Sequence, residues 1–125
     1  MGFRPHIVRQ ANQVTGKCAA PGNTIGRVVL VRASRDLKRV TRQSIIVSPM
    51  TIVQHTAAIR KAQAVVTDEG GLSSHAAVVC RELRKPCIVG TRIATRTFRD
   101  GELIEVDATK GIVQRLKGKS INSLT

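Results

Sequence analysis

The sequence contains no tryptophan and no tyrosine, and its two phenylalanines are Phe3 and Phe98. Proteins that read single-stranded nucleic acids stack bases on aromatic side chains, so this scarcity argues against base stacking but leaves contacts to phosphates open. No stretch approaches the roughly 18 to 20 consecutive apolar residues of a membrane span, and the first residues lead into no apolar signal core. We therefore expect a soluble cytoplasmic protein.

Cysteines are few, and motifs for metals and nucleotides are missing. Cys18, Cys80 and Cys87 form no Cys-x-x-Cys pair, and their odd number argues against a disulfide framework. Cys80 and Cys87 lie in apolar stretches, where cysteine usually acts as a small core residue. A zinc site that joined these thiols to His55 or His75 would lack ligand-pair spacing. The chain also has no glycine-rich phosphate loop, dinucleotide fingerprint or carboxylate cluster, so we expect no metal or nucleotide site within it.

Positive charge is abundant, because 21 lysines and arginines stand against eight acidic residues for a net charge of +13. The excess is uneven: residues 1–66 hold eleven basic side chains and one acidic one, whereas residues 67–125 hold ten and seven. Two interpretations remain open. The basic residues form an ordinary solvated surface, or the first half binds a polyanion such as nucleic acid or an acidic protein.

The length of 125 residues allows one domain. Runs rich in β-branched residues predict six short strands at residues 28–31, 44–47, 64–67, 87–89, 103–106 and 112–116. Helices are expected at 51–62 and 74–84, with a further helical turn at 36–40. Strand and helix signals alternate between residues 44 and 89, which predicts an α/β domain over residues 16–116. Residues 1–15 are expected to form a weakly determined arm, and residues 117–125 a flexible tail.

The second predicted helix has the clearer pattern. Its apolar positions Ala76, Val79, Cys80 and Leu83 fall at i, i+3, i+4 and i+7 on one face. Either Ser73 or Ser74 can cap its start, and Pro86 prevents its continuation.

The segment before this helix suits an anion. Gly70 and Gly71 lack a Cβ atom, so a phosphate can approach their backbone closely. The first helical turn offers unpaired N–H groups and the positive end of the helix dipole. We therefore name Gly70, Gly71, Ser73, Ser74 and Ala76 as candidate phosphate-binding residues.

His75 lies in this first turn and is the candidate nucleophile, because a neutral imidazole can attack phosphorus and form a covalent intermediate. The helix dipole disfavours the charged imidazolium, whereas Asp68 and Glu69 favour it, and the sequence leaves the balance open. The alternative is that the histidine only caps the helix or lies on the surface.

Landmarks in order along most of the chain resemble a known family. They are Ala20-Pro21-Gly22, Gly26-Arg27-Val28, Met50-Thr51, residues 62–71, the signature at residues 73–83, Val89-Gly90-Thr91, Asp100-Gly101, Val106-Asp107 and Gly111-Ile112-Val113. This pattern is similar to the swivelling phosphohistidine, or mobile, domain of phosphoenolpyruvate-utilising enzymes, such as phosphoenolpyruvate synthase and pyruvate phosphate dikinase. The resemblance implies a β/β/α swivelling fold with a partly open barrel and two main helices. It also implies that His75 takes phosphate at one active site and delivers it at another.

Other features of the family are expected in partner domains. The resemblance implies an ATP-grasp nucleotide-binding domain and a barrel that binds phosphoenolpyruvate or pyruvate, with Mg²⁺ and ATP or phosphoenolpyruvate in those sites rather than in this chain. Some positions depart from the family pattern. Residues 52–55 replace a usual proline and acidic residue, and Arg84-Lys85-Pro86 is more basic than the usual Gly-Ile-Pro. Ser73 stands where many dikinases have a threonine that is phosphorylated in plants.

Three functional hypotheses follow. The first is a stand-alone phosphohistidine carrier that works with separate partner subunits, with Arg81, Arg84 and Lys85 either attracting an acidic partner or forming a solvated helix face. The second is a binding or regulatory module whose basic amino-terminal half contacts nucleic acid or an acidic protein. The third is a separated piece of a larger enzyme that has no activity alone.

Overall fold

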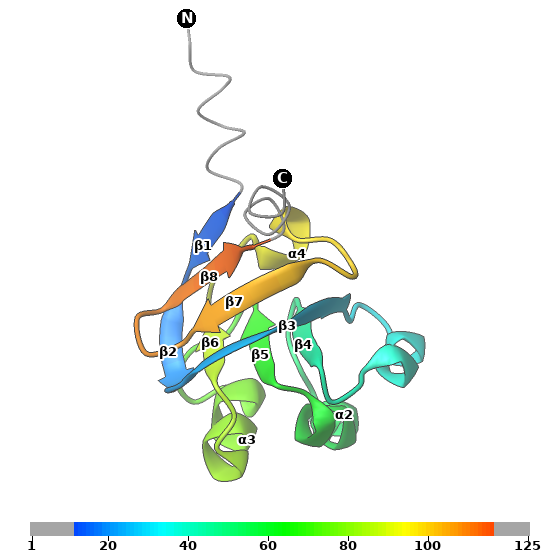
Figure 1. Cartoon of the computed structure of the whole chain (residues 1–125). Coiled ribbons are helices and arrows are strands. Elements are labelled where there is room, and N and C mark those ends of the chain that lie inside the picture. Colours follow the sequence, from blue (N-terminus) through cyan, green and yellow to red (C-terminus); the bar gives the residue numbers. More distant parts are fainter. Residues whose placement is uncertain (1–11, 117–125) are drawn as a thin grey trace, which may run out of the picture.

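The computed structural model describes residues 12–116, which form one curved eight-stranded sheet with helices packed on it (Figure 1). The strands are β1 (Gln13–Thr15), β2 (Lys17–Ala20), β3 (Asn23–Leu30), β4 (Ser44–Ser48), β5 (Ala64–Thr67), β6 (Cys87–Val89), β7 (Leu103–Asp107) and β8 (Ile112–Arg115). The α-helices are α2 (Thr56–Lys61), α3 (His75–Leu83) and α4 (Ala94–Thr97), and two short 3₁₀ helices span Ser34–Arg39 and Val53–His55.

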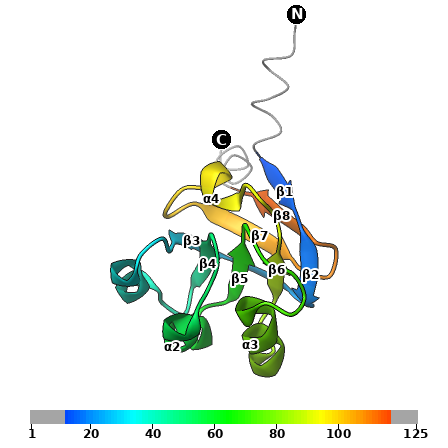
Figure 2. The ribbon, with the colours of Figure 1, turned by 180° about the vertical axis from the view of Figure 1, so that it is seen from behind.

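The sheet curls until its two edges are nearly joined. Its strand order is β1-β8-β7-β3-β4-β5-β6-β2, so the edge strands are β1 and β2. These two strands are consecutive in the chain and are separated by Gly16 alone, as the continuous blue segment in Figures 1 and 2 shows. A Cβ atom on Gly16 would lie 2.7 Å from both a methyl group of Ile88 and the carbonyl oxygen of Val89. A glycine is therefore required where the chain passes from one edge to the other, and the result is a partly open barrel.

The central strands β3, β4, β5 and β6 run parallel, and the flanking pairs are antiparallel. Strands β4, β5 and β6 are buried along their whole length, which explains their unbroken apolar sequences. Alternate side chains of each strand enter two separate cores. In β4, Ile46 packs under the helices, whereas Ile45 and Val47 point into the barrel.

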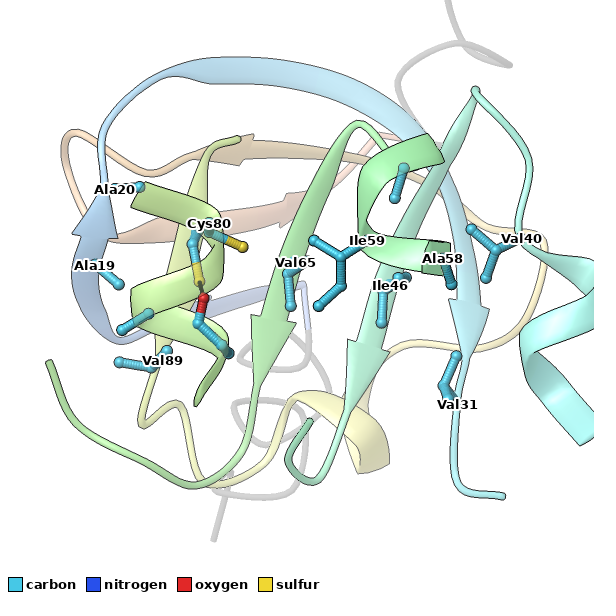
Figure 3. Packing of buried hydrophobic residues seen from close by; sticks show 14 of the residues in the cluster. Ala19, Ala20, Val31, Val40, Ile46, Ala58, Ile59, Val65, Cys80 and Val89 are labelled. Carbon is cyan, nitrogen blue, oxygen red and sulfur yellow. Dashed lines mark hydrogen bonds between the residues drawn. The ribbon is translucent and has the colours of Figure 1, made fainter. Parts of the chain in front are cut away.

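The outer core lies between the sheet and helices α2 and α3 (Figure 3). Ile59 of α2 packs there with Ile46 and Val65, and Cys80 of α3 packs with Cys87. The inner core fills the barrel, where α4 contributes Ala94 and the following residue Phe98. The helices thus have fixed positions on the sheet, because each has buried side chains in one of the two cores.

The α/β class is confirmed, and the number of strands is eight rather than six. Strands β4 to β8 fall where the apolar runs predict them, whereas β3 begins five residues before the predicted run at 28–31. β1, β2 and α4 were not predicted. Gln13–Thr15 lies in the segment expected to be a weakly determined arm but forms β1; the remainder of that arm before Asn12, and the predicted tail at 117–125, lie outside the described residues.

The predicted helix at 51–62 is wrong in its first half. Thr51 lies in an irregular connection, a 3₁₀ turn follows, and only Thr56–Lys61 is α-helical. The predicted helix at 74–84 is α3, and it ends with Arg84 in the left-handed conformation at φ 58°. No helix among the described residues is long and apolar enough to cross a membrane.

Candidate functional site

The site lies where the carboxyl ends of β4 and β5 meet. Parallel neighbours deliver the connections that follow them to the same edge of the sheet. Here the backbone N–H of Asp68 donates to the carbonyl of Ser48 at 3.1 Å, and that of Glu69 donates to the carbonyl of Pro49 at 3.0 Å. The segment after β4 is therefore fastened to the segment after β5, which places Thr51 beside the start of α3.

Helix α3 begins at His75, and Ser74 is its N-cap. The Ser74 Oγ atom accepts from the backbone N–H of Ala77 at 3.4 Å. The sequence left the cap open between two serines, and the geometry assigns it to Ser74 rather than Ser73. Gly70 permits this arrangement, because its φ of +103° is strained for other residues and an added Cβ would lie 3.1 Å from the Ser74 Oγ.

The imidazole of His75 is half-buried and held by one hydrogen bond. Its Nδ1 atom lies 2.9 Å from the hydroxyl oxygen of Thr51, which is itself buried. No other described residue hydrogen-bonds the ring, so Nε2 is left available. When Nδ1–H donates to the Thr51 hydroxyl, Nε2 carries the lone pair. Since the hydroxyl can also donate to Nδ1, the contact orients the ring, and Nε2 is the ring nitrogen without a partner among the described residues.

A hollow of about 260 Å³ adjoins the ring. Among its lining residues are His75 and three of the candidate phosphate-binding residues, Gly70, Ser74 and Ala76. Gly71 and Ser73, the other two candidates, are not among the lining residues, and a Cβ on Gly71 would meet no atom within 4 Å. The structure thus gathers part of the predicted set around the histidine.

The first turn of α3 provides fewer free amides than the sequence suggested. The N–H of Ser74 donates to the carbonyl of Gly71 at 3.1 Å, and the N–H of Ala77 donates to the Ser74 side chain. The N–H groups of His75 and Ala76 have no acceptor among residues 12–116. An anion beside the ring would therefore meet these two donors at the positive end of the helix.

The carboxylate of Asp68 is hydrogen-bonded to the start of α4 and not to His75. It accepts from the backbone N–H of Thr95 at 3.0 Å and from the Thr95 hydroxyl at 2.6 Å. Asp68 therefore fixes the start of α4 to the end of β5. Glu69 is exposed and is, among the described residues, the one acidic residue that lines the hollow beside His75.

Two of the basic residues on and after α3 make internal contacts. Arg81 donates to the carbonyl of Leu72 at 2.6 Å and to that of Ala19 at 3.3 Å. It thus ties the segment before the helix to β2. Lys85 donates to the carbonyl of Ala62 at 2.7 Å. Arg84 is exposed and has no side-chain partner within the described part of the chain.

The cysteines take no part in the site. Cys80 and Cys87 are buried in the outer core, as predicted, and Cys18 is exposed. A hydrogen bond with the Cys80 thiol, together with burial, raises the pKa of the Cys87 thiol far above its usual range. The Cys87 thiol is therefore protonated and acts as an apolar side chain. Over residues 12–116, no three His, Cys, Asp or Glu side chains cluster as a metal site would require.

Thr51 is the functional candidate that sequence reasoning missed. It was noted as part of the Met50-Thr51 landmark but was placed inside a helix and given no role. Its position in the fold offered the missing signal, because it lies three residues after one parallel strand while His75 follows the next. Such segments meet at one edge of a parallel sheet.

Comparison with known proteins agrees with this architecture. Residues 40–111 match the family described as PEP-utilising enzyme, mobile domain. The chain belongs to this family. It is 42% identical over 106 residues to phosphoenolpyruvate synthase of Pyrococcus furiosus, which covers 85% of this chain and 13% of the relative. It is also 42% identical over 98 residues to the probable phosphoenolpyruvate synthase of Archaeoglobus fulgidus, over 78% of this chain and 13% of that protein.

Among solved structures, the chain is similar to the Enzyme I (nEIt) protein, with a TM-score of 0.51 and 26% identity. That match covers 66% of this chain and 38% of the other. The mobile-domain chain therefore spans about an eighth of the length of the curated relatives that it matches. What those longer proteins do with their remaining domains is not carried by these 125 residues.

Proposed function

We propose that this mobile domain is a phosphohistidine carrier, in which His75 accepts a phosphoryl group from one partner site and donates it at another. The single observation that supports this most strongly is the contact between His75 Nδ1 and the Thr51 hydroxyl, at 2.9 Å. It orients the ring and leaves Nε2 without a partner among the described residues, in a side chain that lines the hollow. A histidine that only capped the helix would need no such buried partner.

The proposed phosphoryl transfer to His75 needs no separate base. The Nε2 lone pair attacks phosphorus, the N–P bond forms, and the bond from phosphorus to the donor oxygen breaks, with its electrons leaving on that oxygen. The Nδ1 proton stays on the ring in its hydrogen bond to Thr51, and the ring's new positive charge is offset by the phosphoryl oxygens. We propose that the N–H groups of His75 and Ala76 and the backbone at Gly70, all in the lining of the hollow, stabilise those oxygens. Ser74 contributes by capping the helix that holds these donors.

Partners complete the reaction. We propose an ATP-grasp nucleotide-binding protein or domain on one side and a barrel that binds phosphoenolpyruvate or pyruvate on the other. Mg²⁺, with ATP or phosphoenolpyruvate, belongs to those sites, where it would neutralise the phosphate charge during transfer. The carrier acts either as a separate subunit or as one part of a longer chain, and the chemistry at His75 is the same in both cases.

The test uses the two described histidines as a matched pair. The chain is incubated with a phosphoenolpyruvate synthase whose own mobile domain has been inactivated, together with ³²P-labelled ATP or phosphoenolpyruvate. We expect acid-labile label on the wild-type chain and on His55→Ala, and none on His75→Ala. His55 is a suitable control because its Nδ1 binds the backbone of Ile52 in its own 3₁₀ turn. Equal labelling of both variants would refute the proposal.

The second candidate function is a polyanion-binding module, and it depends on which basic residues of the first half are available to a ligand. Within that half, Arg39 is already bound to Asp36 and Asp100, and Arg4 and Arg9 lie outside the described residues. Arg42, in contrast, lines a basic hollow at the end of the sheet away from His75. That observation favours binding of an anion at one defined place.

A further inference from the structure

A second hollow, of about 720 Å³, lies at the opposite end of the parallel strands from His75. Its walls come from the start of β3, the end of α2 and the residues that precede β4, β5 and β6. The residues before β4 and β5 lie at the end where these parallel strands start, whereas His75 begins the helix that follows β5, at the end where they finish. The hollow is thus separate from the candidate phosphohistidine site.

Five basic residues line this hollow, and no acidic residue is among its lining residues: Arg42, Arg60, Lys61, Arg84 and Lys85. None of the five forms an ion pair with another residue in the range 12–116. Two carboxylates neighbour the lining residue Asn23: Glu105 accepts from its side-chain amide at 3.0 Å, and Asp107 is its partner on β7. The balance of charge around the hollow therefore stays strongly positive, and like charges gathered in a concave wall raise the local potential.

Two of the backbone acceptors in the wall are already occupied by side chains. The carbonyl of Ala62 accepts from Lys85 Nζ at 2.7 Å, and the carbonyl of Arg42 accepts from the Gln63 side chain at 2.7 Å. The other end of that amide, Gln63 Oε1, accepts from the hydroxyl of Thr24 at 2.8 Å. At the end of α3, the carbonyl of Cys80 accepts from the N–H of Lys85. An anion that entered would therefore meet charged donors and few free carbonyl oxygens.

We propose that this basic hollow binds a small anion made of linked phosphate groups, such as inorganic triphosphate or the phosphate chain of a nucleotide. Arginine forks and lysine ammonium groups are the side chains that bind phosphates, and three arginines and two lysines surround one cavity of ligand size. A linked phosphate chain matches this dense charge better than spaced carboxylates do. Nucleic acid is disfavoured, because the hollow has no aromatic side chain for a base and its charge is gathered in a cavity rather than along a stripe.

This proposal is independent of the carrier function of His75. Phosphate-chain binding at the far end would persist in a variant that cannot be phosphorylated. It would also give part of the net charge of +13 a definite role, since five of the 21 basic residues lie around this one hollow.

The test measures binding of inorganic triphosphate and of ATP to the full chain by isothermal titration calorimetry. In the test variant Arg42, Arg60 and Arg84 are replaced by glutamine, and in the control variant Arg92, Arg96 and Arg99 are replaced in the same way. Both variants lose three positive charges, but the control arginines lie near α4 and line no part of the hollow. We expect the test variant to lose at least about thirtyfold in affinity, the control to stay within about threefold, and His75→Asn to bind like the wild type.

Several outcomes would overturn the proposal. Equal losses in the two triple variants would mean that only overall charge matters, and tighter binding of duplex DNA or polyglutamate than of triphosphate would assign the hollow to a macromolecule. Lost binding in His75→Asn would move the ligand to the other end. Triphosphate that binds as well as ATP supports recognition of the phosphate chain, and ATP that binds much more tightly through its base contradicts it. Thermal melting confirms folding, and Arg60→Gln alone carries the test if the triple variant does not fold.

Discussion

The two ends of the parallel strands differ in how their polar groups are used. At the His75 end, side chains are bound to one another and to the backbone: Thr51 to His75, Ser74 to the first turn of α3, and Asp68 to Thr95. At the other end, cationic side chains surround a hollow without counter-charges in its lining. Fixed polar contacts suit a site where a bond must form at one atom, whereas unpaired charges suit a site that binds an anion from solution.

The two ends also differ in what their polar groups contribute to the stability of the fold. A hydrogen bond between half-buried groups stabilises the fold. Removing one partner leaves the other without a hydrogen bond, which lowers the free energy of unfolding. Like charges that gather without partners contribute nothing to stability and work slightly against it. Substitutions of the hydrogen-bonded residues at the His75 end should therefore cost stability or transfer rate, while substitutions of Arg42, Arg60 and Arg84 at the basic end should cost neither.

The largest effect on stability is expected from Asp68→Ala. This change removes both acceptors of Thr95 and frees the start of α4, so the free energy of unfolding should fall by about 2 to 3 kcal/mol. Chemical denaturation measures it. The matched control is Glu69→Ala, which changes an exposed neighbour of the same charge and should cost less than about 0.5 kcal/mol. Equal costs for the two variants would contradict the role of Asp68 in fixing the start of α4.

Thr51→Val should slow phosphoryl transfer with little change in stability. The valine fills the same volume but cannot accept from Nδ1 of His75, so the ring loses the contact that fixes its orientation. We expect a rate lower by about tenfold, equivalent to about 1.4 kcal/mol in the activation free energy. Thr51→Ser keeps the hydroxyl and should transfer at nearly the wild-type rate. A serine variant as slow as the valine variant would show that packing, rather than the hydrogen bond, matters.

Ser74→Ala should lower the free energy of unfolding by about 1 kcal/mol, because α3 loses its N-cap. Ser73 is its natural control: it is the adjacent serine, it is exposed, and it does not cap the helix. Ser73→Ala should therefore be close to neutral. Thermal melts of the two variants measure this difference. A larger loss of stability in Ser73→Ala would place the N-cap one residue earlier than the structure does.

The smallest effect is expected at the basic end. Arg60→Gln removes an exposed charge that has no ion-pair partner among the described residues, so stability should change by less than about 0.5 kcal/mol and in the favourable direction. The change is read from the same denaturation experiment. A fall in the free energy of unfolding above about 1 kcal/mol would show that Arg60 makes a stabilising contact. It would contradict the difference drawn between the two ends of the strands.

Much of the sheet could be predicted, because strands buried on both faces leave unbroken apolar runs. β5 and β6 have the predicted bounds, and β4 extends one residue beyond them. β1, β2 and the first half of β3 left weaker signals. Exposed residues alternate with buried ones there, as in Gln13–Thr15, and pairing with distant strands rather than local propensity makes them strands.

The candidate site was predictable in its local part. Gly70, Ser74 and His75 lie within six residues of one another in the sequence. They lie close together in the fold because they precede and begin the same helix. Thr51 was not predictable in this way, because its contact with His75 spans 24 residues and depends on β4 and β5 being parallel neighbours. The basic hollow was missed for the same reason, since its residues come from segments that are far apart in the sequence.

The most direct test of the carrier function identifies the atom that holds the phosphoryl group. The chain is phosphorylated with ¹⁵N-labelled histidine in place, and long-range nitrogen–phosphorus and nitrogen–proton NMR correlations assign the phosphorylated ring nitrogen. Because Thr51 holds Nδ1 of His75, phosphorus should be bonded to Nε2 of that residue. Phosphorus on Nδ1, on His55 or on a serine or threonine oxygen would contradict the proposal.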